Sequence, residues 1–228
     1  TIHEKRCIVI SRSNETDLHN TIKSNKEVVN MITKSELEKK VIKAIDDNKE
    51  KIVEIAQKIL ENPELGYKEF ETSKLIKEEF EKLSLKTCDK LAYTGVKGVI
   101  GNEKDFNVCI MGELDSVMCT EHKYANERGE AHACGHNAQL ASMMGAAMGI
   151  AGSGVMDELK GAVTFMAVPA EEFIDVEYRN KLKEEGKIKY FGGKQQLIYE
   201  GAFDDTDVAM MVHAQPDTPD AKVFVHAT

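Results

Sequence analysis

The sequence lacks any apolar run long enough to cross a bilayer as a helix. The most apolar stretch, residues 138–151, is too short and too rich in glycine for that. A secretory signal is not visible either, because the run Cys7–Ile10 is far shorter than the apolar core of a signal peptide. We therefore expect no membrane span and no membrane partner.

An excess of basic residues is also missing. The 39 acidic residues outnumber the 30 Lys and Arg residues, which gives a formal net charge of −9. Because binding to a phosphate backbone needs a basic face, we expect no nucleic-acid partner.

Cysteine is too sparse and too scattered to form a disulfide framework. The chain has five cysteines, an odd number, at positions 7, 88, 109, 119 and 134. This usage is typical of a reducing compartment, so we expect a cytoplasmic location.

The 228 residues are enough for one large domain or two small ones. An apolar fraction of 42% and a charged fraction of 30% are typical of a globular protein. The chain starts at Thr1 rather than at a methionine, and it stops within a strand-like alternation over residues 221–228. We expect it to be a piece of a longer protein.

The first third of the chain predicts an arm followed by two amphipathic helices. Residues 1–34 are rich in Ser, Thr, Asn and Lys and have little periodicity, so we expect them to be poorly ordered. Apolar residues recur at helical spacing over residues 35–61, where Ser35 and Glu38 form a capping box. The Asn-Pro pair that follows should end this helix, and a second helix is expected over residues 72–83.

The rest of the chain alternates short apolar runs with helices. The patterns predict strands over residues 106–111, 162–168 and 207–212, and helices over residues 137–150, 174–186 and 194–199. The first of these helices is apolar nearly all round and should be buried. The alternation predicts an α/β fold with a mostly parallel sheet flanked by helices.

The stretch His132–Asn137 (HACGHN) concentrates residues that could bind a metal. Cys134 and His136 are two positions apart, so in extended backbone their side chains point the same way. The dipole of the helix that follows should lower the pKa of the thiol and favour a thiolate. A thiolate and an imidazole that converge are good zinc ligands, although a buried cysteine beside a capping histidine would give the same pattern.

Two adjacent acids, Glu171 and Glu172, follow the strand expected over residues 162–168. The carboxyl ends of parallel strands are where sites form. Because neighbouring side chains diverge, one carboxylate could bind a metal while the other handles the proton of a metal-bound water. An acidic loop on the surface is the other interpretation.

His213 and Asp115 also follow apolar runs that we expect to be strands. His213 could be a metal ligand or a histidine satisfied within the core. Asp115 could hold the second nitrogen of a metal-bound histidine, or it could be a turn or cap residue. Together with Cys134 and His136, these residues fall after separate strands of one sheet, so we expect them to meet at one edge.

Five segments, taken in order, resemble a family of dinuclear metallopeptidases. The family comprises aminoacylases, small carboxypeptidases and indole-acetyl-amino-acid hydrolases, and the resemblance is to the amidohydrolase branch with a cysteine ligand. The matching segments are residues 61–66 (ENPELG), 112–115 (GELD), 132–137 (HACGHN), 169–172 (PAEE) and 212–213 (VH). Asparagine at position 137 is similar to the aminobenzoyl-glutamate hydrolases and dipeptidases of the branch.

The resemblance implies a centre with two divalent metal ions, zinc or manganese. Its ligands would be four side chains: Cys134, His136, Glu172 and His213. Glu171 and Asp115 would be the catalytic residues, with Glu171 as the general base that deprotonates a water shared by the two ions. The hydroxide would attack an amide carbonyl, and Glu171 would return the proton to the leaving amine.

The resemblance also implies an organisation into domains. Residues 35–220 would be the N-terminal part of the catalytic domain, and residues 221–228 would begin a lid and dimerisation domain beyond the chain. A further histidine ligand would lie there too, and the full-length protein would be a homodimer. Glu113 stands where other branches have a histidine ligand, and residues 173–191 are inserted between the glutamates and the Gly192-Gly193 pair.

Three hypotheses follow from the sequence. The leading one is a metal-dependent hydrolase that cleaves a small-molecule amide: an N-acyl amino acid, an aminobenzoyl-glutamate-like compound or a dipeptide. The second is a hydrolase with Cys134 as the nucleophile and His132 or His136 as its base, which a chelator would not inhibit. The third is an inactive chain that keeps the fold, or part of it, and binds a metal or a partner.

Overall fold

The computed structural model describes residues 32–103 and 105–214. The described helices and strands belong to one compact unit that begins at Thr33. Most of the arm predicted over residues 1–34 lies outside the described residues, and so does the segment 221–228.

The described residues form six α-helices, a short 3-10 helix and seven strands. The helices are α1 (Lys34–Asp47), α2 (Lys49–Glu61), α3 (Phe70–Lys82), α4 (His136–Ser153), α5 (Val176–Glu184) and α6 (Gly193–Tyr199), with the 3-10 turn at Val155–Asp157. The strands are β1 (Lys86–Leu91), β2 (Gly95–Gly101), β3 (Asn107–Glu113), β4 (Val117–Met118), β5 (Glu130–Ala131), β6 (Ala162–Val168) and β7 (Val208–Met211). Every helix and strand predicted between residues 35 and 212 has a counterpart here.

The first predicted helix is divided into two helices. α1 begins after Thr33, whose hydroxyl accepts the Glu36 N–H at 3.3 Å, while the Glu36 carboxylate accepts the Thr33 N–H at 2.8 Å. The capping box predicted at Ser35 and Glu38 is therefore wrong by two residues. The side-chain amide of Asn48 donates to a carbonyl in the last turn of α1 at 2.8 Å, and the helix breaks there because this bond competes with the helical backbone.

The main sheet has five strands in the order β1-β2-β6-β3-β7. The three strands expected from the sequence, β3, β6 and β7, run parallel, whereas β1 and β2 join them as an antiparallel hairpin. The predicted α/β class is confirmed, and the sheet is mixed rather than mostly parallel. Sequence patterns missed the hairpin because β1 is polar and β2 contains three glycines. β4 and β5 pair separately.

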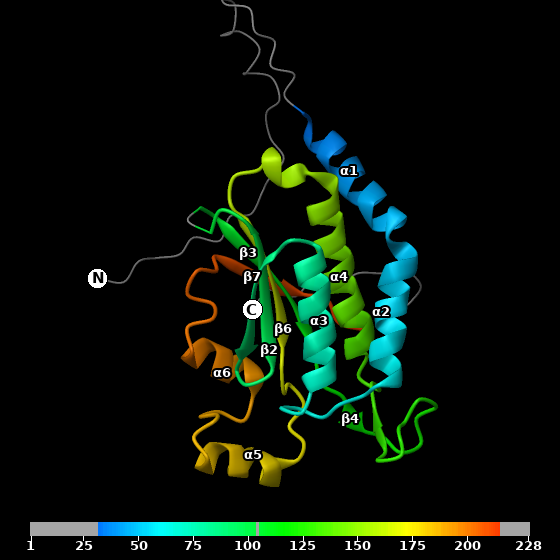
Figure 1. Cartoon of the computed structure of the whole chain (residues 1–228), viewed down its shortest axis with the longest axis vertical. Coiled ribbons are helices and arrows are strands. Elements are labelled where there is room, and N and C mark those ends of the chain that lie inside the picture. Colours follow the sequence, from blue (N-terminus) through cyan, green and yellow to red (C-terminus); the bar gives the residue numbers. More distant parts are fainter. Residues whose placement is uncertain (1–31, 104, 215–228) are drawn as a thin grey trace, which may run out of the picture. The chain divides into compact units, whose positions relative to one another are not determined.

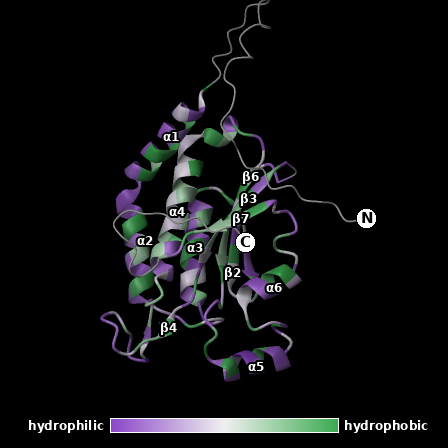
Figure 2. Cartoon of the chain, turned by 180° about the vertical axis from the view of Figure 1, so that it is seen from behind, coloured by the Kyte–Doolittle hydropathy of each residue, from purple (hydrophilic) through white to green (hydrophobic). Residues whose placement is uncertain are grey.

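Helices cover the two faces of the sheet unequally (Figure 1). α3 and α4 pack on one face, and α1 and α2 lie against α4. The core between these layers includes Ile55, Ile76, Phe80, Leu140 and Phe165. On the other face, Leu197 of α6 packs against Cys109 and Met166. Figure 2 shows mixed polarity along α1 and α2 but mostly apolar or neutral residues along α4, which lies between other elements.

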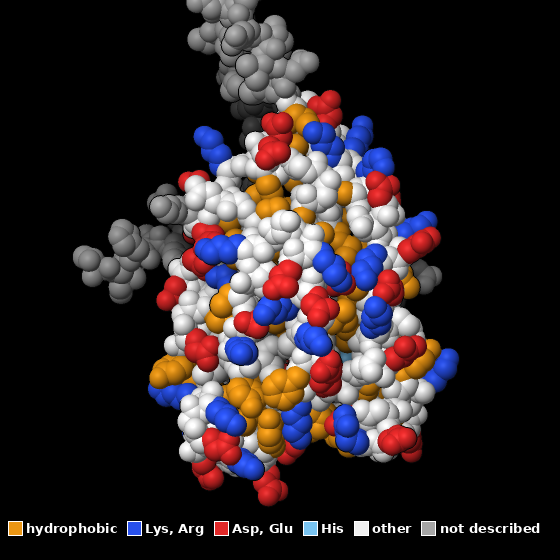
Figure 3. Space-filling view, in the orientation of Figure 1, with side chains coloured by type: hydrophobic (Ala, Val, Ile, Leu, Met, Phe, Trp, Pro, Cys, Tyr) orange, Lys and Arg blue, Asp and Glu red, His pale blue; other side chains and the backbone are white. Residues whose placement is uncertain are grey.

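The face shown in Figure 1 carries charges of both signs. Acidic and basic side chains are interspersed over it, with apolar side chains between them (Figure 3). Within residues 32–103 and 105–214, no helix combines the length and the apolar composition that crossing a bilayer requires.

Candidate metal centre

The carboxyl ends of the three parallel strands lie at one edge of the sheet. Glu113 at the end of β3 pairs with Val168 at the end of β6, and β7 ends beside them at Met211. The residues that follow these strands include Asp115, Glu171, Glu172 and His213. The topology therefore brings the predicted site residues to the edge where parallel sheets form their sites.

The turn before α4 brings Cys134 and His136 to the same edge. Gly135, the N-cap residue, has a φ of +93°, which residues with a side chain rarely adopt. Cys134 lies just before this turn, and His136 is the first residue of the helix. Position 135 needs glycine because the geometry of the turn depends on the positive φ.

Cys134, His136 and His213 form the first of two groups of candidate metal ligands. One ligand atom from each residue lies within 4.8 Å of the other two. Cys134 Sγ is 3.4 Å from His213 Nε2, and the rings of His136 and His213 meet edge to face with centroids 5.6 Å apart. His136 is buried and His213 is exposed, so the group is open to solvent on the side of His213.

Both histidines turn Nδ1 away from the group. Nδ1 of His136 lies 2.8 Å from the carbonyl oxygen of Asp115. Nδ1 of His213 lies 2.6 Å from the carbonyl oxygen of Ala214. Because a carbonyl oxygen only accepts, each Nδ1 donates a hydrogen to it, which leaves Nε2 as the ring nitrogen that faces the group. This is the orientation that metal-binding histidines adopt.

The second group consists of Glu113, His136 and Glu171, whose ligand atoms also lie within 4.8 Å of one another. Nε2 of His136 is 3.1 Å from Glu113 Oε2 and 4.0 Å from Glu171 Oε2. Lys194, near the start of α6, forms an ion pair with the other oxygen of Glu113. Because His136 belongs to both groups, the two are adjacent.

Asp115 is fully buried between His136 and Glu172. Its Oδ2 accepts the Glu172 N–H at 2.8 Å, and its Oδ1 lies 3.5 Å from His136 Nδ1. Among the described residues, this Oδ1 has no hydrogen-bond partner. Glu172 belongs to neither group of candidate ligands, but its carboxylate faces the thiol of Cys134.

The acidic surroundings raise the pKa of Cys134. Burial of the thiol raises it, and the carboxylates of Glu172, Glu171 and Glu113 raise it further, to about 12. The expectation that the start of α4 favours a thiolate is therefore wrong for the chain by itself. Burial of the thiol and the nearby carboxylates together outweigh the helix dipole, because both disfavour a negative charge on the sulfur.

The pKa values of His136 and Glu113 shift in opposite directions. Burial lowers the pKa of His136, but hydrogen bonds and charges from Asp115 and Glu113 outweigh it and raise the pKa to about 10. Burial raises the pKa of Glu113, but its contacts with His136 and Lys194 outweigh this and lower the pKa to about 2. Burial raises the pKa of Glu171, and neighbouring carboxylates raise it further while Lys194 opposes them.

The donors at this edge suit divalent cations. Carboxylate, thiolate and imidazole are the ligands that zinc and similar ions take in proteins. A bound cation would offset the repulsion among the carboxylates and lower the pKa of Cys134. Asp115 Oδ1 is buried and has no hydrogen-bond partner within the described part of the chain, and the carboxylates add to the effect of burial on the thiol pKa, so a bound cation would stabilise this centre.

His132 is close to this centre in sequence but is not paired with Cys134. Its ring is buried, neither ring nitrogen has a hydrogen-bond partner within the described part of the chain, and burial lowers its pKa to about 4. A cysteine nucleophile needs a base in hydrogen-bond reach and a lowered thiol pKa. Neither expected base, His132 or His136, forms a hydrogen bond with Cys134 in the described structure, so this hypothesis is not favoured.

Sequence analysis did not assign a role at the site to Glu113, Gln139 or Lys194. Oε1 of Gln139 accepts the Glu113 N–H at 2.7 Å, and Lys194 pairs with the Glu113 carboxylate. Two signals were available in the sequence. Gln139 lies three residues after His136 and thus on the same helix face, and Lys194 directly follows a pair of glycines.

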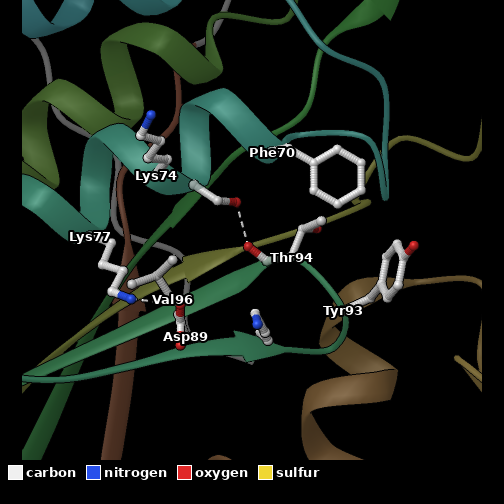
Figure 4. A pocket seen from close by; sticks show the side chains of 9 residues that line it. Phe70, Lys74, Lys77, Asp89, Tyr93, Thr94 and Val96 are labelled. Atoms are coloured by element: carbon white, nitrogen blue, oxygen red, sulfur yellow. Dashed lines mark hydrogen bonds and ion pairs between the residues drawn. The ribbon is translucent and has the colours of Figure 1, made fainter.

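A separate hollow lies between α3 and the β1–β2 hairpin (Figure 4). Its lining includes Phe70, Lys74 and Tyr93, together with Lys77, which forms an ion pair with Asp89 at 2.8 Å. The candidate metal ligands do not line it.

No family model matches the sequence. Among curated proteins, the chain is 38% identical over 147 residues to IAA-amino acid hydrolase ILR1-like 2 of Arabidopsis thaliana, a match covering 60% of this chain and 31% of that protein. It is 28% identical over 179 residues to the hippurate hydrolase of Campylobacter jejuni, a match covering 75% of this chain and 41% of that protein.

Among solved structures, the chain is similar to a dinuclear metal-binding peptidase of the M20 family from Bacillus subtilis. The TM-score is 0.58 at 28% identity, over 74% of this chain and 44% of that chain. The chain thus spans less than half the length of each of these three proteins. The resemblance to amidohydrolases and dinuclear metallopeptidases is confirmed.

Proposed function

The chain is homologous to hydrolases that include amidohydrolases and a dinuclear metallopeptidase, and from this we propose that the protein is a metal-dependent amidohydrolase. One observation carries the proposal. Two adjacent groups of candidate ligands share His136 at the carboxyl edge of the sheet. Within each group, the ligand atoms lie within 4.8 Å of one another.

The proposed ligands of two divalent ions are the four side chains expected from the sequence: Cys134, His136, Glu172 and His213. In support, Cys134 and both histidines form one group, and the Glu172 carboxylate faces the thiol. Bound zinc or manganese ions would supply Lewis acidity, which acidifies a water molecule and polarises an amide carbonyl. Glu113 offers a further oxygen donor 3.1 Å from His136 Nε2.

Glu171 is the proposed general base. Its Oε2 lies 4.0 Å from His136 Nε2, and 37% of its side chain is exposed, so it is beside the proposed ligands and accessible to solvent. Its raised pKa makes it a better proton acceptor than an ordinary glutamate. Glu171 takes a proton from the attacking water and then delivers it to the nitrogen of the leaving amine.

Asp115 acts on the ligands rather than on the substrate. It is fully buried, and its two contacts hold the ring of His136 and the backbone of Glu172. Partners of this kind fix the tautomer and direction of a metal-bound histidine.

An amino acid conjugate is the substrate class that the relatives support. Two of them are named for IAA-amino acids and for hippurate, and both names describe an aryl-bearing acid joined to an amino acid by an amide. An aminobenzoyl-glutamate-like compound has the same connectivity, and a small dipeptide is the other candidate. The homodimer and the cytoplasmic location expected from the sequence belong to the same proposal.

An amidase assay with and without a chelator tests the proposed function. The substrates are N-benzoylglycine, aminobenzoyl-glutamate, N-acetyl amino acids and a set of dipeptides. We expect hydrolysis that the chelator abolishes and that added zinc or manganese restores. Hydrolysis that survives the chelator would support the cysteine nucleophile instead. Metal binding without turnover on any substrate would support the inactive metal-binding hypothesis.

A further inference from the structure

Arg179 of α5 is fully buried within the inserted segment 173–191. Its hydrogen bonds go to backbone carbonyl oxygens. A buried charge is costly unless hydrogen bonds stabilise it. Because Nε of Arg179 has no hydrogen-bond partner among the described residues, the charge depends on the carbonyls that Nη1 and Nη2 contact. The location of the carbonyls therefore shows what the arginine holds.

The guanidinium forms hydrogen bonds with the two residues that flank Glu171. It donates to the carbonyl oxygens of Ala170, at 3.5 Å, and of Glu172, which are the residues on either side of Glu171. A third bond, at 2.6 Å, goes to the carbonyl oxygen of Phe191 at the far end of the insertion. One side chain thus joins the segment that carries the proposed base to the end of the inserted loop.

The N–H groups of the same two residues are held by buried carboxylates. Glu69 accepts the Ala170 N–H and Asp115 accepts the Glu172 N–H, each at 2.8 Å. Glu69 also accepts the hydroxyl of Thr94 at 2.6 Å, and Figure 4 shows Thr94 beside α3. Ala170 has a φ of +50°, a conformation that a residue with a Cβ keeps only when its surroundings hold it.

The slot around Arg179 is built from distant parts of the chain. The guanidinium carbon lies 5.5 Å from the ring centroids of both Tyr67 and Phe173. Gly66 leaves the space, because a Cβ there would lie 2.4 Å from Nη2 of the arginine. The segment 61–66 and the insertion therefore meet around this one side chain.

We propose that Arg179 is a positioning residue of the hydrolytic site. By holding the carbonyl groups of the residues on both sides of Glu171, it sets the direction of the Glu171 carboxylate relative to His136. The proposal rests on the proposed function, because only there does Glu171 act as a base. It also gives the inserted segment a role in supporting the site.

Three variants test this role in the chain as it stands. Arg179→Met removes the charge and the donors but keeps most of the volume, whereas Arg179→Lys keeps the charge. Lys181→Met, at an exposed position of the same helix, is the matched control. The first measurement is amide hydrogen exchange of peptides that cover residues 169–173, β6 and α4.

In Arg179→Met we expect exchange over residues 169–173 to rise by about tenfold or more, while β6 and α4 stay protected. Arg179→Lys should give a smaller rise, and Lys181→Met none. The second measurement separates kcat from KM. We expect kcat to fall by about 10- to 100-fold, with KM within about threefold and metal content unchanged.

Unchanged exchange and kcat in a folded Arg179→Met protein would overturn the proposal. Loss of protection across β6 and α4 in both Arg179 variants would overturn it as well, since Arg179 would then serve the fold as a whole. The exchange measurement needs neither metal nor substrate. A parent chain without amidase activity would therefore contradict the proposed function, while exchange over residues 169–173 would still decide the role of Arg179.

Discussion

Asp115 and Glu171 make different contacts at the candidate metal centre. Asp115 is fully buried and holds a candidate ligand and a backbone N–H, at 2.8 Å each. Glu171 is partly exposed and lies 4.0 Å from His136 Nε2. Both residues are acids that follow strands, but they differ in burial. The buried Asp115 is suited to positioning a ligand, and the partly exposed Glu171 is suited to proton transfer.

Glu171→Gln tests the base. The amide keeps the shape of the side chain but cannot accept a proton, so we expect kcat to fall by about 10²- to 10⁴-fold with metal content unchanged. Glu177→Gln, an exposed acid on α5, is the control. Because Glu171 also belongs to the second group of ligand atoms, a parallel loss of metal would make it a ligand instead and contradict the base assignment.

The pH dependence of stability tests the charge arrangement in protein treated with a chelator. The pKa of Glu113 is lowered from 4.5 to about 2, so its contribution to stability is present above pH 4.5 and is lost as the pH falls toward 2. The pKa of His136 is raised from 6.5 to about 10, so its contribution is present below pH 6.5 and is lost as the pH rises toward 10.

We therefore expect the free energy of unfolding, measured by denaturant titration, to decrease as the pH falls below 4.5 and as it rises above 6.5. Glu113→Gln should flatten the acid side, because the variant has no carboxyl group to titrate there. An acid dependence in Glu113→Gln equal to that of the parent chain would contradict the assigned ion pairs.

At the scale of elements, segments with a continuous apolar sequence were predicted correctly, whereas segments that mix polar and apolar residues were not. β3 and β6 are apolar runs with buried residues on both faces, so each is evident in the sequence without its neighbours. β1 is polar and partly exposed, and it is extended because it pairs with β2. The break at Asn48 depends on one side-chain bond within a longer helical pattern, which periodicity does not show.

The start of α1 gives a direct test at this scale. The structure assigns the cap to Thr33, so Thr33→Ala should lower the free energy of unfolding by about 1 kcal/mol through loss of the cap. Ser35→Ala, at the position expected from the sequence, should change it by less than about 0.5 kcal/mol. Equal effects of the two substitutions in denaturant titrations would contradict the assignment.

At the scale of the molecule, the predicted site residues meet because the strands that precede them end at one edge of the sheet. Local motifs named Cys134, His136 and Glu171, since the donor types stand next to each other in the sequence. Lys194 and Arg179 could not be found that way. They reach the site from α6 and α5, and their contacts exist only after the chain has folded.

Metal content, measured by elemental analysis of the purified chain, tests the central claim most directly. The account predicts about two zinc or manganese ions per chain, and clearly fewer in Cys134→Ser, because the thiolate is a proposed ligand. Cys119→Ser, a free cysteine outside both ligand groups, should bind as much metal as the parent chain. A parent chain without bound divalent metal, or a Cys134→Ser variant with the metal content of the parent, would contradict the account.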